Sequence, residues 1–103
     1  MRRFTVYSGS VLVGHSALEF GDPPMGVAFG PFEPAKGYAA IENECRTNHR
    51  DQSGLNLSVQ TETGMVIPCE GVGILDYSQE QAACIEINIL GVPAPLYSRL
   101  FAQ

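Results

Sequence analysis

The chain has 103 residues, of which 45% are hydrophobic and 17% charged, and 11 acidic against 6 basic side chains give a net charge of −5. This composition is that of one folded domain rather than of a disordered segment. The basic residues are scattered, without the concentrated stripe that nucleic-acid binding needs. No apolar run approaches the ~20 residues that cross a bilayer, and the start lacks the apolar core of a signal peptide. We therefore expect a single cytoplasmic domain, residues 1–103, without nucleic-acid or membrane partners.

The first third of the chain predicts three strands. Residues 4–7 and 11–20 are extended runs joined by a short turn, a pattern that indicates a β-hairpin. Apolar side chains fall on both faces of the second run, and we therefore expect a strand that is covered on both sides. The Gly-Asp-Pro-Pro of residues 21–24 must end that strand. Residues 25–32 then predict a third strand, which two glycines weaken.

Residues from about 35 to 50 predict the main helix. Pro34 suits a first turn, and Tyr38, Ile41 and Cys45 recur at the spacing i, i+3, i+7. This apolar stripe is narrow. It predicts a helix that lies with one side against a sheet.

The second half of the chain alternates apolar and polar residues with the period of β-strands. The runs that carry this pattern are residues 55–60, 65–69, 72–77 and 85–89. Ser78 and Gln81 have the spacing of a capping box, with room for about one helical turn, and residues 96–101 predict a short C-terminal helix. The sequence thus predicts a mostly antiparallel α+β domain, in which six or seven short strands pack on the one main helix.

Cys45 and His49 are the first candidates for a metal site. Four residues apart on a helix, their side chains would point the same way and offer half of a zinc site. Completing that site requires Cys69, Cys84 or His15 to approach from distant segments. In the other interpretation Cys45 lies on the buried stripe and His49 near the end of the helix, where a positive charge is favoured. We expect no metal and no cofactor, and we expect three reduced thiols because no signal peptide is present.

His15 is the centre of the densest group of functional side chains. On a straight strand the α-carbons of His15 and Glu19 lie about 13 Å apart, too far for a hydrogen bond, and Ser16 points to the opposite face. The sequence has no nucleophile elbow, phosphate-binding loop or metalloprotease motif. These observations favour a protein that is not an enzyme. The alternative is a small-ligand pocket or minor enzyme near His15, with Glu19 or Asp22 and a tyrosine such as Tyr38 as helpers.

Asp22, Pro23, Pro24 and Met25 form the most distinctive loop. Two prolines stiffen this loop, so it would lose little conformational entropy on contact with a partner. The alternative is a turn that only redirects the chain. The stretch resembles those of small bacterial proteins, and the resemblance implies no activity.

The acidic charge, the absence of a catalytic signature and the many short strands favour one class of function. An acidic domain attracts a basic partner, and a sheet with an open edge accepts a further strand. We therefore expect a non-enzymatic protein-binding or regulatory module. Its partner would be another protein, or a second copy that pairs through an edge strand.

Overall fold

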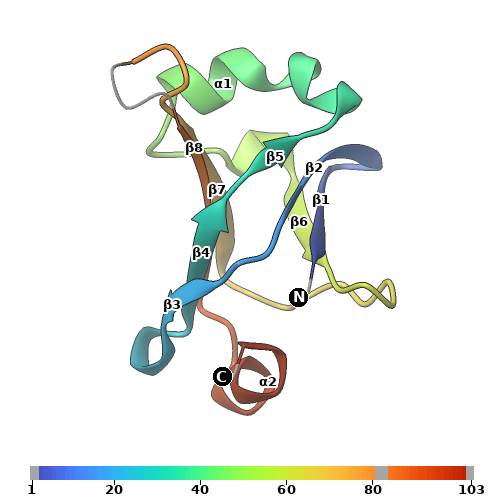
Figure 1. Ribbon diagram of the computed structural model, residues 1–103, viewed down its shortest axis with the longest axis vertical. Helices are drawn as coiled ribbons and strands as arrows, with labels where there is room; N and C mark the ends of the chain where they lie inside the picture. Colours follow the sequence, from blue (N-terminus) through green and yellow to red (C-terminus); the bar gives the residue numbers. More distant parts are fainter. Residues whose placement is uncertain (1–2, 81–83, 102–103) are drawn as a thin grey trace.

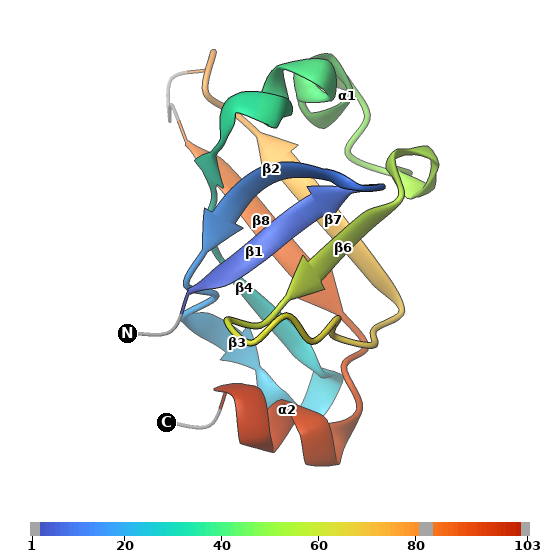
Figure 2. The same ribbon diagram turned by 90° about the vertical axis from the view of Figure 1, so that its right-hand side faces the viewer.

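The computed structural model describes residues 3–80 and 84–101, and these residues form eight strands in two antiparallel four-stranded sheets (Figures 1 and 2). The first sheet has the order β5-β2-β1-β6, and the second has the order β3-β4-β8-β7. The strands are β1 (Phe4–Ser8), β2 (Val11–Ser16), β3 (Phe20–Asp22), β4 (Val27–Pro31), β5 (Glu33–Pro34), β6 (Leu57–Gln60), β7 (Gly71–Asp76) and β8 (Ile85–Leu90).

The core lies between the two sheets. Alternate residues of each strand point inward, because successive side chains of a strand face opposite ways. Each buried Val or Ile side chain contributes about 1.5–3 kcal/mol of hydrophobic stabilisation. The largest fully buried side chains of the strands are Val6, Val13 and Val59 from the first sheet and Ile74, Ile87 and Ile89 from the second.

Helical segments close the two ends of this sandwich (Figure 1). At one end a 3-10 turn, η2 (Lys36–Ala40), leads into α1 (Glu42–Thr47). At the other end lies α2 (Ala94–Phe101), beside β3 and a short turn, η1 (Pro23–Met25), that joins β3 to β4. A last turn, η3 (Ser53–Leu55), precedes β6.

The α+β class and the antiparallel pairing agree with the sequence, but the prediction of one sheet on one main helix is wrong. The long run of residues 11–20 bends at Leu18, whose φ is 46°, and its two halves enter different sheets as β2 and β3. Ser16 fixes the bend, since its hydroxyl accepts a hydrogen bond from the Leu18 amide at 3.1 Å. Apolar residues lie on both faces of this run because it serves two sheets.

The predicted helix over residues 35–50 is also wrong in extent. Its α-helical part is Glu42–Thr47, and the preceding turn is a tighter 3-10 turn pressed onto β2. Gly37 permits this approach, because a Cβ there would lie 2.4 Å from the Leu12 carbonyl oxygen. Tyr38 and Cys45 are buried as the stripe predicts.

Most of the other predicted elements are confirmed. The N-terminal hairpin is β1 and β2, β4 falls within residues 25–32, and β6, β7, β8 and α2 lie at or near their predicted positions. Residues 65–69 make an isolated bridge between Gln60 and Val66 instead of a strand. The predicted capping box ends on Gln81, which lies outside the described residues. Among the described residues, no helix is both long enough and apolar enough to span a membrane.

Candidate functional site

The sequence-predicted site residues fall into three separate places. Glu19 and Pro23 line a pocket between β3 and α2, and Asp22, Pro24 and Met25 adjoin it on β3 and η1. The other two residues lie elsewhere. His15 is half-buried near the end of β2, opposite Thr5 and Glu33, and Tyr38 is buried beneath α1.

Three of the four sheet edges in the described structure are covered, capped at one residue or very short. The β6 edge is covered by the segment after it, where the amide of Ile67 donates to the Val59 carbonyl and that of Thr61 to the Met65 carbonyl, both at 2.9 Å. β5 has two residues. The β7 edge is capped by a side chain at one residue, Ile74, and β3 is the remaining edge.

Gln52 caps the β7 edge at Ile74. Its side-chain amide donates to the Ile74 carbonyl at 2.8 Å, and its side-chain oxygen accepts from the Ile74 amide at 2.7 Å. A third hydrogen bond, to the Asn48 carbonyl at 3.0 Å, holds the side chain in place. Gln52 thus imitates one residue of a neighbouring strand, and Ile74 must direct its backbone polar groups away from β8.

The direction of the backbone polar groups at Ile74 determines their direction across the whole second sheet. In antiparallel pairs, residues alternate between bonding to one neighbour and to the other. Ile87, the β8 residue opposite the capped position, therefore bonds to β4, where it faces Gly30. The next β4 residue, Phe29, then bonds to β3, where it faces Phe20. Gly21, which follows, directs its N–H and C=O out of the sheet.

Two observed hydrogen bonds at the ends of these strands follow the same alternation. The Tyr77 amide donates to the Cys84 carbonyl at 2.7 Å, and the Phe32 amide donates to the Ile85 carbonyl at 2.9 Å. Both have the partners that the alternation requires. Within the described residues, no hydrogen bond reaches Gly21 from outside the sheet, so β3 presents an unpaired donor and an unpaired acceptor at one position.

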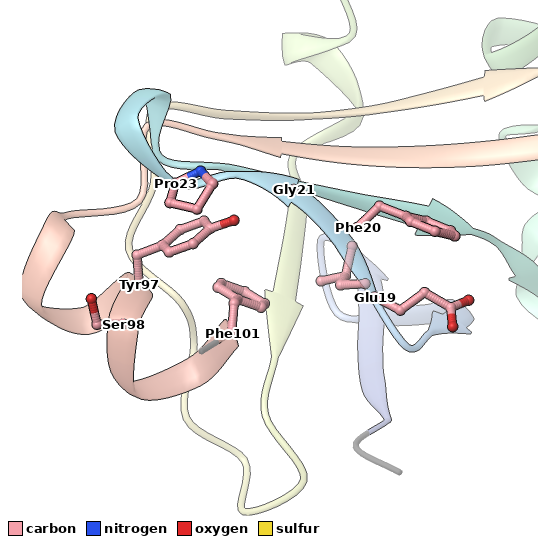
Figure 3. Close-up of a pocket in the computed structure, with 8 residues that line it drawn as sticks. Glu19, Phe20, Gly21, Pro23, Tyr97, Ser98 and Phe101 are labelled. Atoms are coloured by element: carbon pink, nitrogen blue, oxygen red, sulfur yellow. The ribbon is translucent and has the colours of Figure 1, made fainter. Parts of the chain in front are cut away.

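A pocket of about 290 Å³ adjoins Gly21 on the α2 side (Figure 3). Tyr97 and Phe101 extend from α2 toward β3, with their ring centroids 4.9 Å apart. The Tyr97 hydroxyl donates to the Val27 carbonyl at 2.7 Å, and burial and the charge of Asp22 raise the pKa of Tyr97. The residues that line the pocket are Leu18, Glu19, Phe20, Gly21, Pro23, Tyr97, Ser98 and Phe101.

The absence of a side chain at Gly21 is required here. A Cβ at that position would lie 2.1 Å from the Tyr97 hydroxyl, so any other residue would displace α2 or the tyrosine. Glycine inside a strand commonly marks such a close approach. The consequence is that α2 and β3 lie close together while the outer side of Gly21 stays accessible.

The surface around the pocket is apolar and acidic. Phe20 is 54% exposed and stacks on Phe29, with the ring centroids 5.6 Å apart, and Met25 is 67% exposed. Glu19 and Asp22 are both exposed, and they are the charged residues of the segment 17–31. A partner at this site would meet unpaired backbone groups, an apolar pocket and two carboxylates.

Tyr38 belongs to a buried polar cluster that holds η2 and α1 on β7. The Asp76 carboxylate accepts hydrogen bonds from the Tyr38 hydroxyl and from the amide and hydroxyl of Ser78, and Arg46 Nε lies 3.6 Å away. Burial opposes the charge of Asp76, but the bonds from Ser78 and Tyr38 and the charge of Arg46 keep its pKa below the usual value. Tyr38 and Asp76 are 3% and 2% exposed, so the cluster is closed to a substrate.

Cys45 and His49 do not form the half-site that their spacing suggests. His49 Nε2 lies 2.8 Å from the backbone carbonyl oxygen of Cys45, and its ring packs edge-on against Tyr77. Cys45 is fully buried, and burial raises the pKa of its thiol to about 11, so the thiol is neutral near pH 7. Among the described residues, no group of three or more His, Cys, Asp and Glu side chains could hold a metal ion.

Comparisons with models of protein families, with curated proteins and with solved structures each found no match, so the function is inferred from the geometry of the chain itself.

Proposed function

We propose that this chain is a non-enzymatic protein-binding module that takes an extended segment of a partner protein as an additional strand along β3. The observation that carries the proposal is the unpaired N–H and C=O of Gly21, at a sheet edge of the described structure where these groups adjoin an apolar pocket. Addition of a strand satisfies both groups, as in other domains that recognise peptides by an open sheet edge.

The surroundings of Gly21 support binding of a segment with side chains rather than backbone pairing alone. Two backbone hydrogen bonds contribute about 0.5–1.5 kcal/mol each. An apolar side chain buried in the adjacent pocket adds about 1.5–3 kcal/mol. These contributions sum to about 2.5–6 kcal/mol before the cost of ordering the segment is subtracted, so the expected affinity is on the order of millimolar. Such a module would bind reversibly.

A second copy of the chain fits the β3 edge less well than another protein does. In a symmetric antiparallel pair centred on Gly21, each glycine would face the other, and Phe20 would face Asp22. The pocket would stay empty, since glycine has no side chain to fill it, and the carboxylates would meet no positive charge. The geometry therefore favours a heterologous partner, and light scattering of the purified protein at increasing concentration provides the test.

The direct test uses selection of peptides and mapping of their binding site. Ten-residue peptides selected on the intact protein from a phage-displayed library are expected to slow hydrogen exchange of the Gly21 amide and to shift the NMR resonances of β3. Phe20→Lys should abolish binding, because a lysine on an edge strand opposes further pairing. Val66→Lys is the matched control, since Val66 is 53% exposed and lies on the covered β6 edge.

Two results would contradict the proposal. One is a Gly21 amide that exchanges as fast with the bound peptide as without it. The other is an equal loss of affinity in the two lysine variants, which would place the peptide elsewhere or indicate a general effect of charge.

A further inference from the structure

The geometry points to the sequence class of the segment that β3 accepts: an antiparallel strand that reads, from its N-terminus, basic, large apolar, apolar, basic. This inference rests on the proposed function, because it specifies the partner of the same edge. It follows from the register that Gly21 imposes, from the size of the pocket and from the positions of the two carboxylates.

Gly21 fixes the register of the added strand. Its N–H and C=O both point outward, and an antiparallel partner residue directly opposite exchanges both hydrogen bonds with it. Directly opposite residues place their side chains on the same face of the sheet. The face on which Gly21 would carry a side chain is the face of Tyr97, whose hydroxyl lies 2.1 Å from the position of a Cβ. The partner residue opposite Gly21 therefore directs its side chain toward α2 and the pocket.

The pocket accepts a large apolar side chain. Its volume is about 290 Å³, and an apolar cavity of about 150 Å³ is enough to hold benzene. Leu18 and Tyr97 are buried at 3% and 5% exposure, and Phe101 is half-buried beside them. Phenylalanine or leucine fits this lining, whereas valine would leave part of it unfilled.

The neighbouring positions of the added strand face Phe20 and the two carboxylates. An antiparallel segment runs past Asp22 first, then Gly21, then Phe20, then Glu19. The residue opposite Phe20 shares its face with the exposed ring, and aromatic and β-branched cross-strand pairs are favourable. The residues opposite Asp22 and Glu19 meet a carboxylate each, in a segment, residues 17–31, without a basic side chain. Lysine or arginine at these two positions complements the charge.

The antiparallel direction follows from the sheet and from β3 itself. The pairs of the second sheet are antiparallel, and antiparallel pairing is slightly more stable per residue than parallel pairing. β3 offers one outward residue, so a single antiparallel partner residue satisfies both of its groups. The order of the two apolar residues in the segment thus becomes a test of direction.

The test uses three end-blocked hexapeptides on the intact protein at low salt. Thr-Lys-Phe-Val-Lys-Thr is expected to bind most tightly. Thr-Lys-Val-Phe-Lys-Thr, which places valine opposite Gly21, is expected to bind about fivefold more weakly, a factor of the size that one or two buried methylenes produce. Thr-Glu-Phe-Val-Glu-Thr is expected to bind at least about tenfold more weakly, because two attractive cross-strand pairs become repulsive. Isothermal titration gives the affinities, and the exchange rate of the Gly21 amide gives the position.

A pair of double variants separates local charge from net charge. Glu19→Gln with Asp22→Asn should remove most of the difference between the lysine and glutamate peptides. Glu62→Gln with Glu80→Gln changes the net charge equally at two exposed positions outside the site, and it should preserve most of that difference.

The outcomes distinguish the inferred sequence class from the proposed function. If the three peptides bind with equal affinity and each protects the Gly21 amide, strand addition holds and the sequence class is wrong. If the lysine peptides bind without protecting that amide, both are wrong, and the same conclusion follows if no peptide binds at millimolar concentration. A fivefold preference for the swapped peptide would overturn the antiparallel direction.

Discussion

The two edges of the second sheet end in opposite ways. β7 is six residues long, and Gln52 occupies both backbone groups of Ile74. β3 is three residues long, and Gly21 directs its groups to solvent beside an apolar pocket. An unpaired edge is a template for another strand, and proteins usually block it. The two edges of this sheet therefore differ in what they offer a further strand: β7 is blocked at Ile74, and β3 is not blocked at Gly21 in the described structure.

Under the proposed function, two features would keep the open edge from pairing indiscriminately. β3 has one outward residue, so backbone pairing alone yields too little free energy for stable association. Glu19 and Asp22 repel acidic segments and require positive charge nearby. Selectivity therefore depends on side chains, whereas β7, with its longer run of backbone groups, would accept strands of many sequences if Gln52 were absent.

The largest expected effect on stability comes from the buried polar cluster around Asp76, which holds η2 and α1 on β7. Asp76→Ala removes the acceptor of the Tyr38 hydroxyl and of two Ser78 groups, and it leaves Arg46 without its buried counter-charge. We expect a loss of about 3 kcal/mol in the free energy of unfolding, measured by urea denaturation. Asp51→Ala is the control, because Asp51 is exposed and its side chain bonds only to Ser53 in the described structure. Equal losses in the two variants would show that the buried cluster adds no stability.

Removing the Gln52 side chain, which caps the β7 edge, is expected to have the next largest effect on stability. Gln52→Ala leaves the amide and carbonyl of Ile74 without partners, and we expect a loss of about 2 kcal/mol. The variant should also exchange the Ile74 amide faster and self-associate at high concentration, because β7 becomes an open edge. Gln79→Ala, at an exposed position, should change neither property. A Gln52→Ala protein as stable and as monomeric as the parent would mean that Gln52 does not block the edge.

A smaller effect is expected from acid, since protonation of Asp76 weakens the cluster without deleting it. Hydrogen bonds and Arg46 hold the pKa of Asp76 below its usual value despite burial. The unfolded chain therefore binds the proton first as the pH falls below about 4, the ordinary value for Asp. The stability that this group contributes is complete above that pH and is lost as the pH falls toward the folded-state pKa. Urea midpoints at pH 6, 4 and 3 should fall more for the parent protein than for Asp76→Asn; parallel curves would contradict this.

The sequence predicts local structure here far better than the division into sheets. Ile85, Ile87 and Ile89 alternate with polar residues, and this pattern alone locates β8. The division depends on Leu18, which adopts a left-handed φ of 46°. That conformation is usual for glycine or asparagine and rare for leucine. A run of apolar and small residues therefore looked like one continuous strand.

The site was predictable in part. The charged and turn-forming residues Glu19, Asp22 and Pro23 stand out in the sequence and do lie at the pocket or beside it. Tyr97 lies 70 residues along the chain from Val27, to whose carbonyl its hydroxyl donates, and the tertiary fold alone brings these two residues together. Gly21 offered one usable signal, because a glycine between two strand residues indicates a close approach of another element.

The smallest expected effect on stability is at Phe20, and it separates the open edge from the covered one most sharply. Phe20 is 54% exposed and loses mainly its stacking on Phe29, so Phe20→Lys should cost about 0.5–1 kcal/mol by urea denaturation. Val66→Lys should cost a similar amount or less. A side chain that contributes little to the fold, yet is required for peptide binding, belongs to a surface kept for a partner. If Phe20→Lys instead destabilised the protein as much as Gln52→Ala does, the ring would be needed to hold β3 on β4, and its exposure would say nothing about binding.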